Sequence, residues 1–501
     1  MKQNIAVIGA GLGGLVTAKT LLEYGHDVTV FEKENEIGGV WSPCRHYPGL
    51  TTQNTRDTYA FSDFRMPKEY PEFPAGAQML GYLKAYAKHF GVTPHIRLRH
   101  RIDAAEPATN GGWLLTGDGD GQPFSEHFDF LAVCNGTFSE PFIPQAPGME
   151  AFSAGGGRIL HTTQTASPDL YRNKKVVVVG YGKSACDVAS AVADEALETY
   201  LVYRQAKWKV PKRVAGANYK YLVLSRFGEA LTKLRYRNDF ENLIHALGLP
   251  PAIFRRMQRI FAKQQQLEAC GLLPEASITD LLFGELSVES DGFFRKVREG
   301  MIGAIPGEVR SFQKGNLLLS GGERIEADTV IYGTGFSQNL FFLSEDVLGA
   351  FTDADGNYLL HRHILPVRVP GLAFVGYNTS FFCNLTSEMA ALWLAEWLRG
   401  NIALPSPADM EAQILDHLNW RKQFRTNSLY RNASVYPFNT TYVDRLLKDM
   451  RAALPLPALL SEWLVVVEPS HYAPVKRKIM ERSGIPAGRT RAGQALAASP
   501  V

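Results

Sequence analysis

The 501-residue chain has no pair of cysteines at the spacing of a redox dithiol. Its five cysteines are scattered as Cys44, Cys134, Cys186, Cys270 and Cys383. This arrangement argues against a dithiol oxidoreductase, and an odd, scattered set is typical of a reducing cytosol. We therefore expect a cytoplasmic location.

The chain also lacks a long apolar run and a strong charge imbalance. No apolar stretch reaches the roughly 20 residues of a membrane helix, and an expected strand begins so near Met1 that we expect no signal peptide. The net charge of +3 is too small to indicate a nucleic-acid binder. The length predicts two or three domains, and a hydrophobic content of 45% is typical of globular proteins.

Glycine, in contrast, is arranged in two patterned loops. Residues 4–8 form a short apolar run that predicts a strand buried on both faces. Gly9, Gly11 and Gly14 follow at once in the GxGxxG pattern. The first allows a tight turn, the second lets the backbone approach a pyrophosphate, and the third lets a helix pack on the strand. The N-terminus of that helix directs its N–H groups at the phosphates.

An acidic residue follows this loop at the position that contacts the ribose. The helix should run to about Tyr24 and stop at Gly25, and a second strand over residues 27–31 should end at Glu32. Glu32 stands 18 residues after Gly14, close to the expected spacing of about 20. A carboxylate accepts hydrogen bonds from ribose hydroxyls and repels a 2′-phosphate, so this site predicts FAD.

A second loop of the same kind lies near the middle of the chain. Residues 174–179 predict another buried strand, and Gly180 and Gly182 follow it, with Ala185 as the third small residue. The next expected strand, residues 199–203, ends at Arg204. Arginine forks onto a phosphate, so this site predicts NADPH, with NADH as the alternative. Further donors to the 2′-phosphate could come from Lys183, Ser184 and Lys207.

The order of these signals predicts an α/β fold of two Rossmann-like dinucleotide-binding domains, one inserted in the other. Strands running into glycine turns are expected at residues 128–136, 328–336 and 370–377. We assign all three to a discontinuous FAD domain. The expected parts are an FAD domain at 1–150 and 325–400, an NADPH domain at 151–324 with a helical insertion at about 214–300, and a helical C-terminal extension at 401–501 with a disordered tail.

Two further segments carry functional expectations. A helix over residues 385–398 would place Thr386 and Ser387 in its first turn, where its dipole favours reduced, anionic flavin; a plain helix cap is the alternative for these side chains. Residues 204–263 hold fourteen Lys and Arg against three Asp and Glu. They predict a solvated basic face, with an acidic substrate or peripheral contact with an anionic membrane as alternatives.

The motifs taken together resemble the flavin-containing monooxygenases, single-chain enzymes that use FAD and NADPH to oxygenate soft heteroatoms. The resemblance covers roughly residues 1–400. It is carried by Gly38-Gly39-Val40-Trp41, Phe61-Ser62-Asp63-Phe64, Val133-Cys134-Asn135-Gly136 with Pro141, Gly182-x-Ser184-Ala185-x-Asp187, and Thr334-Gly335-Phe336.

The chain departs from the family pattern at two places. In the linker motif only Gly157 and His161 are retained, while Gly155 and Thr165 stand where the family has aromatic residues. We expect His161 to form structural hydrogen bonds in the linker, with a catalytic base as the alternative. The family also places an asparagine eight residues before Phe61. That count reaches Gln53, and Asn54 is adjacent, so either amide could donate to a flavin peroxide oxygen.

The resemblance implies an NADPH-dependent monooxygenase that forms an FAD C4a-hydroperoxide and passes its distal oxygen, taken from O2, to nitrogen or sulfur of a small-molecule substrate. Baeyer–Villiger oxygenation of a ketone is the first alternative, and an oxidase-like or degenerate flavoprotein is the second. No metal site is expected. The candidate residues are Gln53 and Asn54 for catalysis, Gly9, Gly11, Gly14, Glu32, Gly39, Trp41, Gly335 and Thr386 for FAD, and Gly180, Gly182, Lys183, Ser184 and Arg204 for NADPH.

Overall fold

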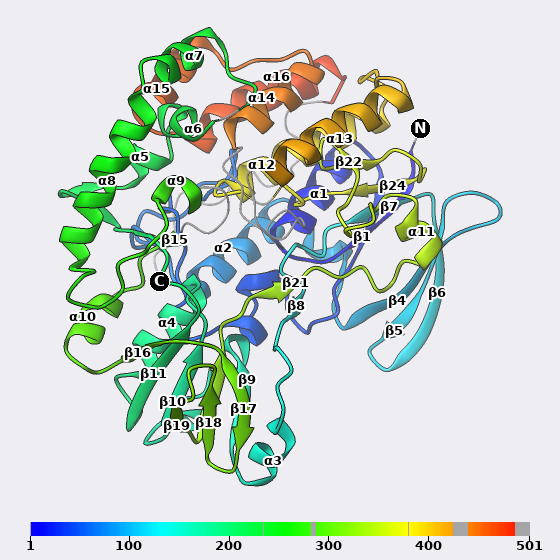
Figure 1. The fold of residues 1–501 in the computed structure, drawn as a ribbon. Helices are drawn as coiled ribbons and strands as arrows, with labels where there is room; N and C mark the ends of the chain where they lie inside the picture. The colour runs from blue at the N-terminus through cyan, green and yellow to red at the C-terminus, as the bar shows by residue number, and fades with distance from the viewer. Residues whose placement is uncertain (1, 234, 282–286, 379, 424–438, 486–501) are drawn as a thin grey trace. The chain divides into compact units, whose positions relative to one another are not determined.

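The structure is a computed structural model that describes all residues except 1, 234, 282–286, 379, 424–438 and 486–501. The chain divides into two compact units (Figure 1). The first unit comprises 1–42, 54–139 and 338–501, and the second comprises 43–53 and 140–337. The alternation of strands and helices and the parallel sheets confirm the predicted α/β class.

A five-stranded parallel sheet forms the centre of the first unit. Its strand order is β24-β7-β1-β2-β3. Ala6 and Ile8 belong to the apolar cluster on one face of this sheet, and the alternate residues Ile5 and Val7 therefore face α1 on the other. Burial on both faces explains the unbroken apolar run. The bounds are β1 Asn4–Ile8, β2 Asp27–Phe31, β3 Ile96–Arg97, β7 Phe130–Val133 and β24 Leu372–Phe374.

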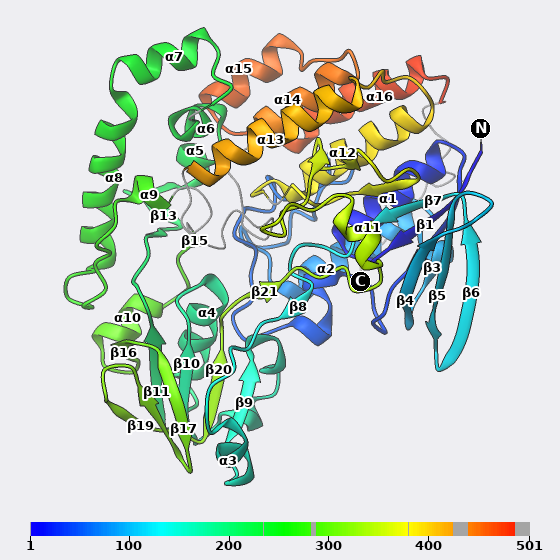
Figure 2. The ribbon, with the colours of Figure 1, turned by 45° about the vertical axis from the view of Figure 1, so that its right-hand side comes forward.

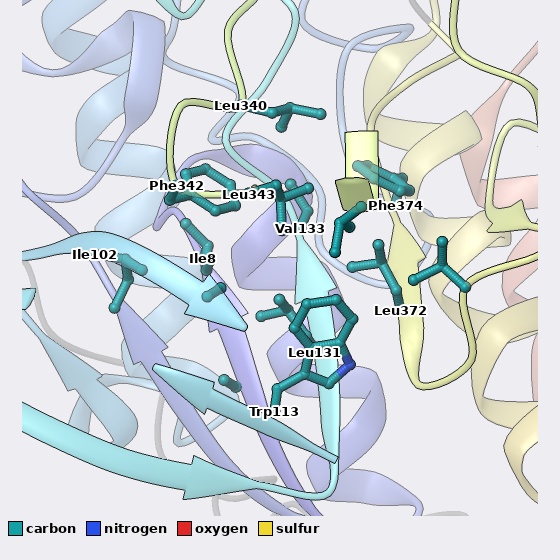
Figure 3. Packing of buried hydrophobic residues seen from close by; sticks show 14 of the residues in the cluster. Ile8, Ile102, Trp113, Leu131, Val133, Leu340, Phe342, Leu343, Leu372 and Phe374 are labelled. Atoms are coloured by element: carbon teal, nitrogen blue, oxygen red, sulfur yellow. The ribbon is translucent and has the colours of Figure 1, made fainter. Parts of the chain in front are cut away.

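An antiparallel three-stranded sheet packs against the face of the parallel sheet that carries Ile8. Figure 3 shows Trp113 of this sheet beside Leu131, and Ile102 beside Ile8. Leu340, Phe342 and Leu343 close the same cluster. The antiparallel strands are β4 His100–Pro107, β5 Trp113–Gly119 and β6 Gln122–Phe128.

Helices cover the other face of the parallel sheet. α1 and α12 pack together, and α14 packs on α12 (Figure 2). α12 is the helix predicted over 385–398, and it begins two residues earlier, at Cys383. The helices of this unit are α1 Leu12–Glu23, α2 Gly76–His89, α11 Glu345–Gly349, α12 Cys383–Leu398, α13 Pro407–Gln423, α14 Thr440–Asp449, α15 Leu456–Leu464 and α16 Ala473–Arg482, and a small hairpin joins β22 Leu360–His361 to β23 Leu365–Pro366.

The second unit is built on its own five-stranded parallel sheet, in the order β16-β11-β10-β20-β9. Val177 packs into a cluster with Phe312 and Leu317 of a three-stranded antiparallel sheet, while α4 contacts β10 and β11. The bounds are β9 Arg158–His161, β10 Lys175–Val179, β11 Glu198–Tyr203, β16 Gly303–Pro306, β17 Val309–Gln313, β18 Asn316–Leu319, β19 Arg324–Glu326, β20 Thr329–Tyr332, α3 Met149–Ala154, α4 Lys183–Val192 and α10 Phe293–Arg298.

The expected helical insertion at about 214–300 lies within this second unit. It consists mainly of short helices, and α8 is the longest of them (Figure 2). The elements of the insertion and of the segment that leads into it are α5 Lys220–Val223, α6 Arg226–Thr232, α7 Asp239–Ala246, α8 Leu249–Gln265, α9 Ile278–Leu281, β12 Lys209–Val210, β13 Arg213–Val214, β14 Ala217–Asn218 and β15 Ser287–Val288. Within the described part of the chain, no helix combines the length and apolarity needed to cross a membrane.

The unit boundaries differ from the expected domain boundaries at 150 and 325. The expected strand within 328–336 is β20, which pairs with β10 and β9 and so belongs to the second unit, whereas the expected boundary at 325 groups it with residues 1–150. β8 (Glu140–Pro141) pairs with β21 (Phe336–Ser337), which places both crossing segments in the second unit. The described helices after residue 400 belong to the first unit. The expected disordered tail lies outside the described residues.

Candidate functional site

The backbone of the first glycine loop leaves no room for side chains at two of its glycines. Gly9 has a φ of +103°, and a Cβ added to Gly14 would lie 1.8 Å from the carbonyl oxygen of Gly9. α1 can therefore approach β1 closely only with glycine at this position. Gly11 is the N-cap of α1, and no side chain caps the helix. Its first N–H groups are thus directed at the loop, as an anion site requires.

Glu32 lies beside this loop. Its side chain is buried, and its two carboxylate oxygens accept hydrogen bonds from the backbone N–H groups of Ala10 (2.8 Å) and Glu34 (3.0 Å). Burial raises the pKa of Glu32, and these two N–H groups oppose the rise. The residue predicted to contact the ribose is therefore fixed against the loop predicted to contact the pyrophosphate.

A second glycine turn packs against the first. The N–H of Gly38 donates to the carbonyl of Ala10 at 2.9 Å. Gly39 has a φ of +59°, and a Cβ added to it would lie 3.1 Å from the Cα of Gly11. Trp41, two residues later, is buried. The structure therefore brings the predicted residue Gly39 to the Gly9–Gly14 loop, and Trp41 follows in the same turn.

The first turns of α12 lie near the same loop. A Cβ added to Gly376 would meet Ser387 Oγ at 3.7 Å and Gly13 Cα at 4.0 Å. Thr386 is buried, and its hydroxyl donates to the carbonyl of Cys383 at 3.4 Å. Thr386 thus lies in the first turn of α12, as expected, with its hydroxyl engaged inside the helix.

The two amide candidates are separated by the boundary between the units. Asn54 belongs to the first unit, is buried, and donates from Nδ2 to the carbonyl of Phe381 at 2.7 Å. Gln53 belongs to the second unit, where its Oε1 accepts from the N–H of Val288 at 3.0 Å and its carbonyl accepts from the hydroxyl of Tyr219. These two neighbours in sequence therefore make their hydrogen bonds within different units.

The second glycine loop repeats the backbone of the first. Gly180 has a φ of +129°, and a Cβ added to it would lie 2.5 Å from the carbonyl oxygen of Gly333. Gly182 is the N-cap of α4, again without a side-chain cap, and Ser184 lies in the first turn. Arg204 follows the end of β11. Its side chain is 75% exposed, and its Nε lies 2.9 Å from Glu308 Oε1.

Lys183 does not extend from the second loop as predicted. Its ammonium group is paired with Asp187 one turn along α4, and the two side chains are 10% and 2% exposed. Burial raises the pKa of Asp187, and Lys183 opposes the rise. Tyr47 also hydrogen-bonds to Asp187. This cluster was not predicted from the sequence, although Asp187 stands in the motif Gly182-x-Ser184-Ala185-x-Asp187.

His161 and Gly335 meet in the second unit. The Nε2 atom of His161 lies 3.0 Å from the carbonyl of Gly335, and Nδ1 lies 3.3 Å from the N–H of Thr163. A carbonyl can only accept, so Nε2 carries the proton and Nδ1 accepts. Burial lowers the pKa of His161, which favours this neutral form. These contacts are the structural hydrogen bonds that we expect of His161, and they hold Gly335 within the second unit.

A cluster of buried charged side chains lies within the first unit and was not predicted. It joins α1, the Phe61–Phe64 motif, α12 and α16 through ion pairs of Lys19, Asp63, Glu388 and Lys476. Asp63 was visible in the sequence only as part of a family motif. Lys476 carried no signal, because a lysine on an amphipathic helix is usually solvated.

Known proteins are similar to this chain in both sequence and fold. A family model described as flavin-binding monooxygenase-like matches residues 2–463. Human flavin-containing monooxygenase 1 is 26% identical over 472 residues, which is 90% of this chain and 84% of that protein. Rhesus macaque (Macaca mulatta) flavin-containing monooxygenase 3 is 26% identical over 491 residues, which is 94% of this chain and 86% of that protein.

Two solved structures illustrate the similarity of fold. S-allyl-L-cysteine S-oxygenase from Allium sativum has a TM-score of 0.62 at 20% identity, covering 97% of this chain and 98% of that one. A steroid monooxygenase bound to NADP has a TM-score of 0.66 at 17% identity, covering 89% of this chain and 97% of that one. Several structures of cyclohexanone monooxygenase match over a similar extent.

Proposed function

The chain belongs to the flavin-binding monooxygenase-like family, and on that premise we propose that it transfers one oxygen atom from O2 to nitrogen or sulfur of a small organic substrate. It is an FAD- and NADPH-dependent monooxygenase. The observation that carries the proposal is the family match over residues 2–463, which spans both glycine loops.

The first unit suits FAD. A Cβ at Gly14 would collide with the loop, α1 begins without a side-chain cap, and Glu32 is fixed against the loop by two backbone N–H groups. These are the features that a pyrophosphate and a ribose without a 2′-phosphate need. The residues assigned to FAD are Gly9, Gly11, Gly14, Glu32, Gly39, Trp41 and Thr386. Gly335, which we also assign to FAD, lies in the second unit.

The second unit suits NADPH. Gly180 and Gly182 form the equivalent loop, and the exposed side chain of Arg204 can exchange its contact with Glu308 for a phosphate. The residues assigned to NADPH are Gly180, Gly182, Ser184 and Arg204. Lys183 contributes indirectly, because its ammonium group is held by Asp187 inside the unit.

When bound, NADPH supplies a hydride and reduced FAD supplies the activation of O2. The protein holds both cofactors, excludes water and orients the substrate. Asn54 is the amide that we assign to the activated oxygen. It belongs to the unit that suits FAD, and its bond to the carbonyl of Phe381 fixes the side chain at the start of α12. Gln53 is instead engaged with β15 in the other unit.

The test is product analysis with a tertiary amine, a thioether and a cyclic ketone, combined with the amount of NADPH consumed and hydrogen peroxide released. N- or S-oxide formed in near-equal amount to the NADPH consumed supports the proposal. Lactone from the ketone alone would make the enzyme a Baeyer–Villiger oxygenase. Hydrogen peroxide without oxygenated product across a broad panel would make it an oxidase.

A further inference from the structure

We propose that Lys476, on the C-terminal helix α16, is a positioning residue that holds the loop carrying Asn54 on α12. The inference rests on the proposed function, because it gives Asn54 the role assigned above. All the residues involved lie in the first unit.

The loop over residues 54–64 is attached at four points to the first turns of α12 and the residues just before it. The Asn54 amide donates to the carbonyl of Phe381 at 2.7 Å, and the Tyr59 hydroxyl lies 3.0 Å from Cys383 Sγ. The remaining two are the Asn384 amide to the carbonyl of Tyr59 at 2.8 Å, and the N–H and hydroxyl of Ser62 to the Glu388 carboxylate at 2.9 and 2.8 Å. The position of Asn54 thus depends on α12 and on Glu388.

The buried carboxylate of Glu388 has a cation beside it. Its side chain is 1% exposed, and Lys476 Nζ is paired with it. The same ammonium lies 2.5 Å from Asp63 Oδ2, which Lys19 of α1 also contacts at 2.8 Å. An uncompensated buried charge is strongly destabilising, so the loop, α12 and α1 are held together by a cation that comes from α16.

The electrostatics of the cluster agree with this arrangement. Burial alone would raise the pKa of Asp63, but Lys476 and Lys19 outweigh it and hold that pKa below its usual range. Burial alone would lower the pKa of Lys476, but Glu388 and Asp63 raise it above its usual range. The charged or titratable groups that face Lys476 are Asp63, Glu388, Glu23 and Lys19, and Tyr82 and Tyr86 of α2 lie around the carboxylates.

The experiment compares Lys476→Met with Lys476→Arg and with the matched control Lys478→Met, an exposed lysine on the same helix. In the holoenzyme we expect K476M to release several-fold more hydrogen peroxide per NADPH, with the rate of anaerobic reduction by NADPH nearly unchanged. K476R should restore much of the coupling, and K478M should match the wild type. In an Asn54→Ala background, K476M should add little further uncoupling, because both changes act through the same amide.

A second readout uses the apoprotein. Lys476 is the first of the two lysines that hold the pKa of Asp63 below its usual value. Without it that pKa should rise, so K476M should lose less stability than the wild type as pH falls from about 5 to 3. K478M should keep the wild-type slope, and Asp63→Asn should remove the difference between K476M and the wild type. This measurement remains possible if K476M binds FAD poorly.

Three results would decide against the proposals. K476M that is no more uncoupled than K478M and keeps the wild-type pH slope of stability would overturn the positioning role. K476M that slows reduction and oxygenation alike, in proportion to its loss of stability, would make Lys476 merely structural. Wild-type enzyme that yields only hydrogen peroxide would overturn the proposed function, while the pH slope of the apoprotein would still report on the cluster.

Discussion

The two glycine loops have similar backbone conformations. They differ in how far the residue expected to contact the sugar is buried. Glu32 in the first loop is 7% exposed and bonded to two backbone N–H groups. Arg204 in the second has a side chain that is 75% exposed and paired with Glu308, which is itself 60% exposed. One residue is part of the interior, and the other lies in solvent.

This difference separates two ways of recognising a nucleotide. Glu32 is oriented before any ligand arrives, so little ordering entropy is lost on binding. Arg204 must reorient, but its exposed ion pair with Glu308 is worth only about 0–1 kcal/mol and is easily exchanged for a phosphate. A preorganised site suits a cofactor that stays bound, and an open site suits one that enters and leaves in each turnover.

The largest expected effect comes from the third small residue of each loop. Gly14→Ala would place a Cβ 1.8 Å from the carbonyl oxygen of Gly9, so α1 must move away from β1. We expect the variant to purify without FAD, measured as flavin absorbance per protein. In the second loop this position is already alanine, and Ala185→Gly should keep FAD and cost about 0.5–1 kcal/mol of stability. A G14A protein with full flavin content would contradict the close packing.

Lys183 provides the next effect, which should appear in stability rather than in cofactor choice. Lys183→Met leaves the buried carboxylate of Asp187 without its ammonium partner. Removing one partner of a buried pair costs about 3–5 kcal/mol, which urea unfolding would measure. The ratio of the KM values for NADPH and NADH should stay the same. A selective loss of NADPH binding in a stable K183M protein would show that Lys183 does reach the 2′-phosphate.

Arg204 should determine the choice between NADPH and NADH. Arg204→Gln removes charge-assisted hydrogen bonds worth about 1.5–3 kcal/mol. We therefore expect a KM for NADPH raised by about 10- to 100-fold, with the KM for NADH nearly unchanged, in steady-state oxidation assays. Glu308→Gln is the matched control and should change either KM by less than about threefold. Equal losses for both nucleotides would assign the 2′-phosphate to other residues.

The strands, helices and turns around the two loops could largely be predicted from the sequence, because residues close in sequence determine them. The expected strands over 4–8 and 27–31 are β1 and β2 with the same bounds, and α1 ends at Glu23, just before the glycine at 25. Buried strands carry unbroken apolar runs, and glycine marks the turns that need a positive φ.

The parts that could not be predicted depend on distant partners. Lys476 contacts Asp63 across 413 positions of sequence. Residues 43–53 pack in the second unit although both flanking segments belong to the first. Charge partners and chain crossings of this kind are set by tertiary packing, which neither periodicity nor spacing encodes.

The smallest expected effect tests whether Glu32 is as preorganised as its contacts indicate. Burial raises the pKa of Glu32 in the folded protein, so the folded state holds its proton more tightly than the unfolded state. Stability of the apoprotein should therefore fall as pH rises from about 4.5 through the raised pKa, and then level off. Glu32→Gln should remove this slope in urea unfolding and weaken FAD binding by about fivefold, because a neutral amide accepts weaker hydrogen bonds than a carboxylate. If the slope persists in E32Q, another group causes it, and the first site is less fixed than its hydrogen bonds suggest.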